Sequence, residues 1–116
     1  MIITIHNTRT GVVICTRCKV ASSLVARGVG LLDRSGLESG EGLLLKPCSS
    51  VHCFFMRFAI DIAFLDRDGK VLKVYDSMKP WRVSTIVRGA KQTLELPSGV
   101  LSATDTVVGD VLVVAS

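Results

Sequence analysis

Two alternating apolar segments joined by an Asp-Gly turn constrain the fold more than any other feature of the sequence. The first segment, IDIAFLD, covers residues 60–66, and the second, KVLKVY, covers residues 70–75. The residues RDG between them form the turn, because Asp-Gly between two apolar runs is a strong signal for a β-hairpin. Side chains alternate between the two faces of each strand. The chain is therefore predicted to build on antiparallel β-structure.

Further short apolar segments predict that strands dominate the chain. Residues 2–6 and 12–17 flank the turn sequence NTRTG and form a second predicted hairpin. The remaining predicted elements are strands at 43–46, 50–58, 82–89, 93–97 and 110–115, a loop at 77–81, a short helix capped by Ser22–Ser23, and a helical turn at 98–105. We therefore expect one α+β domain over residues 1–116, with a mostly antiparallel curled or barrel-like β-sheet and one or two short helices.

The composition is that of a globular protein. Hydrophobic residues make up 48% of the chain and charged residues 21%, which argues against disorder. No apolar run approaches the roughly 18 residues of a membrane span, and the N-terminal residues lack a signal-peptide pattern. A cytoplasmic protein with reduced thiols is therefore expected. Nothing in the sequence indicates an oligomeric state.

The segment 79–91 is basic, in a chain whose net charge is +4. It contains four basic residues around Trp81 and no acidic residue. Cations beside an aromatic ring can bind single-stranded nucleic acid through phosphate contacts and base stacking. A solvated cationic edge explains the same pattern, and we favour it, so nucleic acid is not the expected partner.

The stretch PCSSVHCFFMRFAID, residues 47–61, gathers most of the reactive side chains. Cys48, His52 and Met56 have the residue types and rough spacing of a blue-copper loop. Such a site needs a second histidine, and His6 is the only other one in the chain. Copper is therefore not expected.

Zinc is the second metal that the cysteines suggest. Cys15 and Cys18 together with Cys48 and Cys53 give four thiols in two pairs. If Cys15 and Cys18 lie in one strand, alternation sends them to opposite faces, where they cannot share an ion. A redox role for that pair is weak, because Cys18 lies several residues ahead of the predicted helix start. We expect neither a metal nor a cofactor.

A cysteine nucleophile with His52 as its base is the enzymatic alternative. Strand residues 52 and 53 point apart, so Cys48 is the better nucleophile of the two nearby cysteines. Free cysteine is also one of the most frequently buried residues, and we favour that simpler interpretation. Whether the protein is an enzyme stays open at this point.

Several motifs together resemble a catalogued family. They are Arg27 with GLL at 30–32, GLLLKPCSSVHCFFMRFAIDIAFLDRDGKVLKV at 42–74, KPW at 79–81, LELPSG at 94–99 and GD at 109–110. The sequence in this way resembles domain-of-unknown-function family 192, whose members are small prokaryotic proteins. The resemblance implies a compact β-rich domain with a helix packed on it, and no known activity. The residues that match the family pattern are Cys48, His52, Met56, Arg57, Asp61, Trp81, Glu95 and Gly99, whereas Cys53 departs from it.

The predicted site is a polar cluster at one end of the sheet. It contains His52, Arg57, Asp61 and Glu95, with Trp81 as a lid or stacking surface. We expect this cluster to bind a small or acidic ligand, with donors from the histidine and arginine and an apolar wall from the tryptophan. The rival interpretations are a hydrolase or transferase that uses the Cys–His pair, and a single-stranded nucleic-acid binder that uses the basic segment.

Overall fold

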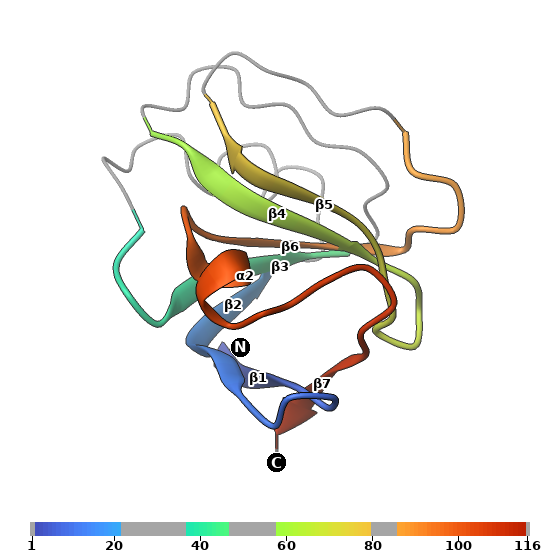
Figure 1. Cartoon of the computed structure of the whole chain (residues 1–116), viewed down its shortest axis with the longest axis horizontal. Coiled ribbons are helices and arrows are strands. Elements are labelled where there is room, and N and C mark those ends of the chain that lie inside the picture. Colours follow the sequence, from blue (N-terminus) through green and yellow to red (C-terminus); the bar gives the residue numbers. More distant parts are fainter. Residues whose placement is uncertain (1, 22–36, 47–57, 80–85, 116) are drawn as a thin grey trace.

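The described residues form one curled sheet of seven strands together with one short helix. The computed structural model describes residues 2–21, 37–46, 58–79 and 86–115. The elements within these ranges are β1 (Ile2–Asn7), β2 (Val13–Ala21), β3 (Glu41–Leu45), β4 (Ile60–Leu65), β5 (Val71–Met78), β6 (Gln92–Pro97), α2 (Val100–Ala103) and β7 (Leu112–Ala115). The sheet bends round so that β5 and β7, its two edges, approach each other (Figure 1). No helix in these ranges is long and apolar enough to cross a membrane.

The sheet is mixed, although most neighbours run antiparallel. Its strand order is β5-β4-β6-β3-β2-β1-β7, and the one parallel pair among the described strands is β2 with β3. Parallel strands require a long crossover, which the chain between Ala21 and Glu41 supplies. Both predicted hairpins are confirmed, since β1 pairs with β2 and β4 pairs with β5 in antiparallel register. The expected mostly β, curled architecture is therefore found, as a half-barrel.

The two edges of the curled sheet meet at one end. The backbone N–H of Val71 donates to the carbonyl of Asp110 at 2.7 Å, and that of Leu112 donates to the carbonyl of Gly69 at 2.9 Å. Gly69 is required here, because its φ is +90° and a Cβ would lie 2.2 Å from the Leu112 carbonyl oxygen. The turn of the β4–β5 hairpin is thereby fixed against the start of β7.

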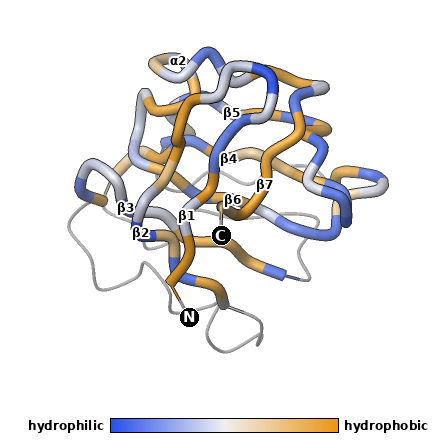
Figure 2. Tube along the Cα trace, turned by 90° about the horizontal axis from the view of Figure 1, so that it is seen from below, coloured by the Kyte–Doolittle hydropathy of each residue, from blue (hydrophilic) through white to orange (hydrophobic). Residues whose placement is uncertain are grey.

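The central strands are buried on both faces. The face enclosed by the curl packs against α2, β1 and β7, and we call it the inner face; it carries Ala63, Leu65, Leu94 and Leu96. The other side of the same strands, called the outer face, carries Leu43, Leu45, Ile60, Ile62 and Phe64. Apolar residues therefore follow one another in β3 (43–45) and β4 (62–65), whereas polar and apolar residues alternate in β6 (Figure 2). Every residue of β4 is buried as a result.

Several predicted boundaries are wrong within the described residues; β2, for example, runs to Ala21 although its strand was expected at 12–17. β5 continues through Met78, where a loop at 77–81 was expected, because Met78 pairs with Ile60 beyond a β-bulge in which the N–H of Ser77 donates to the Asp61 carboxylate. Residues 86–89 form a turn at Gly89 (φ +84°) rather than the end of a strand at 82–89. Phe58 lies in a bend rather than in a strand at 50–58. The predicted helix at Ser22–Ser23 falls outside the described residues.

Candidate functional site

Glu95 lies in the middle of β6 and on the outer face of the sheet. Its register partners are Leu43 on β3 and Ile62 on β4, so its side chain leaves the sheet between two core residues. Residues paired in this way project to the same face. The side chain is 4% exposed. The sequence therefore places a carboxyl group inside an apolar cluster.

The Glu95 carboxyl has no hydrogen-bond or ion-pair partner among the described residues. Burial raises its pKa to about 7, because leaving water disfavours the charged form. At neutral pH the group therefore divides between a protonated form that donates a hydrogen bond and an ionised form that accepts one. Carboxyl groups tuned to this range are used for proton transfer and for binding donors.

Asp61 lies on β4 and points to the inner face, opposite Glu95. Its carboxylate accepts hydrogen bonds from the backbone N–H groups of Ser77 at 2.8 Å, Gly99 at 3.1 Å and Leu101 at 2.9 Å. These donors belong to the end of β5 and to the start of α2, so one buried side chain fixes two segments to β4. Backbone donors therefore use most of the acceptor capacity of the Asp61 carboxylate.

The structure therefore separates two of the predicted site residues. Asp61 pairs with Leu96, and Glu95 pairs with Ile62, so the two carboxyl groups occupy opposite faces although they are near neighbours in the sheet. The other predicted site residues, Cys48, His52, Arg57 and Trp81, lie outside the described residues. Their grouping with Glu95, and the Cys–His pair, stay predictions.

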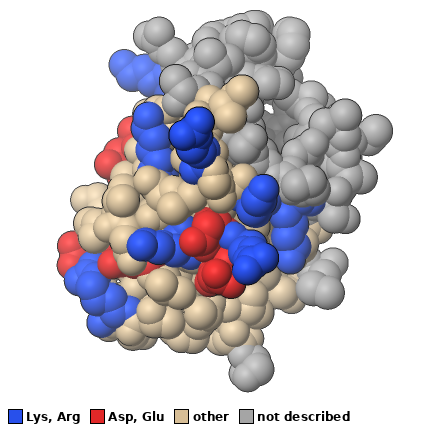
Figure 3. Space-filling model, turned by 90° about the vertical axis from the view of Figure 1, so that its right-hand side faces the viewer, with Lys and Arg blue, Asp and Glu red and all other residues tan. Residues whose placement is uncertain are grey.

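The basic segment 79–91 is described at residue 79 and from 86 onward, where its three basic residues are exposed. Figure 3 views the side of the molecule that holds the 86–91 turn. Among the residues coloured there, acidic and basic side chains are interspersed rather than gathered into one basic surface. Mixed charges of this kind fit the solvated edge that we favoured over nucleic-acid binding.

Cys15 and Cys18 share the inner face, which corrects the expectation that they point apart. The register of β1 with β2 shifts between Ile3–Cys18 and Ile5–Cys15, and this β-bulge adds a residue that restores the same orientation. Both thiols are buried and free. The interaction between the two neighbouring thiols lowers the pKa of Cys15 and raises that of Cys18. Among the described residues no group of three or more metal-ligating side chains is found.

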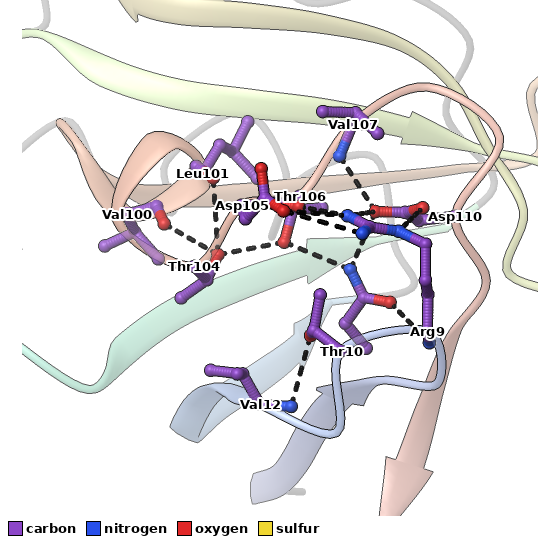
Figure 4. A network of polar contacts seen from close by, with 11 residues as sticks. Arg9, Thr10, Val12, Val100, Leu101, Thr104, Asp105, Thr106, Val107 and Asp110 are labelled. Carbon is purple, nitrogen blue, oxygen red and sulfur yellow. Dashed lines mark hydrogen bonds and ion pairs between the residues drawn. The ribbon is translucent and has the colours of Figure 1, made fainter.

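A second polar network, which the sequence did not predict, joins the two ends of the chain (Figure 4). The buried Asp110 carboxylate accepts hydrogen bonds from Arg9 Nε at 2.7 Å, from Asn7 Nδ2 at 2.8 Å and from the Val107 N–H at 2.9 Å. The hydrogen bond from Arg9 is the main reason that the pKa of Asp110 lies far below its usual range. The only sequence signal for this network is the Gly109–Asp110 pair. Both oxygens of the Asp110 carboxylate accept hydrogen bonds, so the network clamps β1 to β7.

Comparison with known proteins places the chain in a family. The model of DUF192, described as an uncharacterized ACR, matches residues 4–114. A UPF0127 protein of Pyrococcus furiosus is 34% identical over 107 residues, which cover 90% of this chain and 91% of the relative. The chain therefore belongs to DUF192, the family that its motifs resemble, and that family has no assigned function.

Two solved structures share the fold. One is a protein of unknown function from Novosphingobium aromaticivorans, with a TM-score of 0.85 and 20% identity over 97% of this chain and 84% of that chain. The other, from Sinorhizobium meliloti, is described as a candidate transcription regulator, with a TM-score of 0.84 and 20% identity over 98% of this chain and 94% of that chain. At this level of identity the likeness extends to the fold alone.

Proposed function

We propose that this protein is a small-ligand-binding β-rich module, and that its ligand places a hydrogen-bond donor against Glu95 on the outer face. The observation that carries this proposal is the buried Glu95 carboxyl without a partner among the described residues. Burying a polar group without a hydrogen bond costs free energy, and a ligand that supplies the donor would recover that cost. Groups that destabilise a fold in this way are frequent at binding sites.

The rest of the proposed site comes from the sequence. His52 and Arg57 would bind an acidic part of the ligand, and Trp81 would form an apolar wall. Asp61 is assigned a different role, because its carboxylate already accepts three backbone hydrogen bonds on the inner face. The ligand is thus expected to combine a donor for Glu95 with an acidic group.

A second candidate is an enzyme in which Glu95 moves a proton. Its pKa of about 7 supplies both protonation states at neutral pH, as general acid–base catalysis requires. Cys48 and His52 would then act as nucleophile and base of a hydrolase or transferase. An enzyme returns a chemically altered ligand, whereas a binding module returns the same molecule.

The proposal also places the protein in the cytoplasm. The free thiols of Cys15 and Cys18 support this location, because thiols stay reduced there. A nucleic-acid binder that uses segment 79–91 is the least supported alternative. It would show an affinity that falls steeply with salt concentration.

Native mass spectrometry after incubation with a small-molecule cell extract tests the ligand site. We expect the wild-type protein to retain an added mass that Glu95→Gln loses. Glu38→Gln serves as the matched control, because it makes the same change at an exposed glutamate. Failure of the wild type to retain any added mass, or equal retention by Glu95→Gln, would contradict the proposal.

A further inference from the structure

A cavity of about 260 Å³ opens at the end of the half-barrel, beside the turn of the β4–β5 hairpin. Its floor consists of buried side chains of the inner face from four strands, namely Ile5, Leu44, Leu65 and Leu112. The mouths of β-barrels are among the places where proteins bind small molecules. A water molecule takes about 30 Å³ in the liquid, so the cavity holds roughly nine non-hydrogen atoms.

The rim of the cavity includes an unpaired section of β7. Val114 lines the cavity with a side chain whose register partner is Ile5, and it is 55% exposed. The N–H of Leu112 points away from β1 to Gly69, so the N–H and carbonyl of Val114, two residues on, point the same way. Within the described ranges these two groups have no backbone partner. Val114 therefore offers an apolar surface and main-chain hydrogen-bonding groups together.

Arg67 supplies a positive charge at the same rim. Its guanidinium has no ion-pair or hydrogen-bond partner among the residues that the structure describes, and it lines the cavity with its neighbour Asp68. Gln92 Nε2 donates to the Asp66 carbonyl, which leaves its own side-chain carbonyl at the lining. An anion is attracted by the Arg67 guanidinium and repelled by the Asp68 carboxylate, so it must approach from the side of Arg67.

We propose that this barrel mouth binds a small apolar monocarboxylate. The hydrocarbon body covers Leu112 and Val114, which removes exposed apolar surface from water. The carboxylate of the ligand pairs with the Arg67 guanidinium and accepts a hydrogen bond from the N–H of Val114. Both hydrogen bonds are charge-assisted.

This site is separate from the one proposed at Glu95. The cavity lies on the inner face, whereas Glu95 projects from the outer face. Loss of either site by substitution is therefore expected to leave the other intact.

Titration with octanoate, followed by amide NMR shifts and calorimetry, tests the proposal. We expect the amide signals of Gly69, Leu112 and Val114 to move, and 1-octanol and octylamine to bind more weakly than octanoate. Arg67→Gln should weaken octanoate binding about tenfold, toward the affinity of 1-octanol. Arg88→Gln, the same change at an exposed arginine outside the cavity, should leave the affinity unchanged.

A blocking variant gives a second readout. Val114→Trp places a large ring at an exposed rim position, so the fold should persist while octanoate is excluded. The proposal is overturned if octanoate does not bind at millimolar concentration, if octylamine binds as tightly, or if Arg67→Gln or Val114→Trp binds octanoate like the wild type.

Discussion

Asp61 and Glu95 occupy neighbouring positions on two paired strands, yet their carboxyl groups leave opposite faces of the sheet. Both are buried, with exposed fractions of 0% and 4%. The Asp61 carboxylate accepts hydrogen bonds from three backbone N–H groups, whereas that of Glu95 has no partner among the described residues. One acid therefore holds segments of the fold together, whereas burial of the other without a described partner costs stability.

Replacement of Glu95 by Gln should flatten the dependence of stability on pH. The folded protein holds this proton up to about pH 7, whereas the unfolded chain releases it near 4.5. Between these values the folded state binds more protons, so the free energy of unfolding falls as pH rises, by about 3 kcal/mol in all. Gln does not titrate, and the variant should lack this loss. Urea denaturation from pH 4 to pH 8.5 measures the difference.

Glu38→Gln is the control for that experiment, since its exposed carboxyl should leave the pH profile of the wild type unchanged. Identical profiles for wild type and Glu95→Gln would show that folding does not raise the pKa of the Glu95 carboxyl, which would then be ionised at neutral pH in the folded protein. The basis for the proposed ligand site would then be lost.

Asp61→Asn should destabilise the protein by about 2–3 kcal/mol, because the amide turns an N–H₂ group toward backbone donors and leaves them unpaired. Chemical denaturation measures the loss. Hydrogen exchange should also accelerate at the amides of Ser77, Gly99 and Leu101. Asp76→Asn makes the same change at an exposed position on β5 and should cost little. Equal stability of the two variants would show that Asp61 does not anchor the backbone.

Asp110→Asn should cost about 2 kcal/mol at neutral pH, since it breaks a buried, charge-assisted network. Because the folded pKa of Asp110 lies below its unfolded value, its stabilisation is present above about pH 4 and is lost as pH falls further. Acidification should therefore lower the stability of the wild type toward that of the variant, which lacks this stabilisation at every pH. Thermal unfolding at several pH values measures both effects.

Asp105→Asn is the comparison on the same arginine. Its carboxylate lies 3.4 Å from Arg9 Nη2, but its side chain is 78% exposed. An exposed ion pair contributes little, so this variant should stay within about 0.5 kcal/mol of wild type. If Asp105→Asn is as damaging as Asp110→Asn, burial does not set the strength of the network.

Local sequence signals predicted both hairpins, but not how distant strands meet. The Asp68–Gly69 turn predicted the β4–β5 hairpin because turn chemistry and alternation act over adjacent residues. The same parity rule failed at Cys15 and Cys18, where a bulge adds a residue that no sequence letter marks. Glu95 was expected in a strand at 93–97, and it lies in β6.

Whether Glu95 shares a face of the sheet with Asp61 depends on the register of β6 with strands that are distant in the sequence. That register follows from global packing, so a single sequence could not separate Glu95 from Asp61. The same limit hid the contact of Arg9 with Asp110, which lies 101 residues away along the chain.

Gly69→Ala should be the most damaging of the glycine substitutions at the closure of the half-barrel. A Cβ there would lie 2.2 Å from the Leu112 carbonyl oxygen, at a φ of +90° that alanine adopts only with strain. The turn must then move away from β7, breaking the Leu112 N–H bond to Gly69, and we expect a loss of about 3 kcal/mol. Chemical denaturation measures that loss, and hydrogen exchange at the Leu112 amide reports the broken bond.

Gly109→Ala separates the two causes, because Gly109 has a φ of +98° but nothing within 4 Å of its Cβ position. It carries the backbone strain without the clash, so its cost should be about 1 kcal/mol. A faster-exchanging Leu112 amide in Gly69→Ala alone would show that close approach of backbone to backbone holds the edges of the sheet together. Equal costs for the two variants would mean that positive φ accounts for the whole effect, and that the contact between Gly69 and Leu112 does not limit what the turn can accommodate.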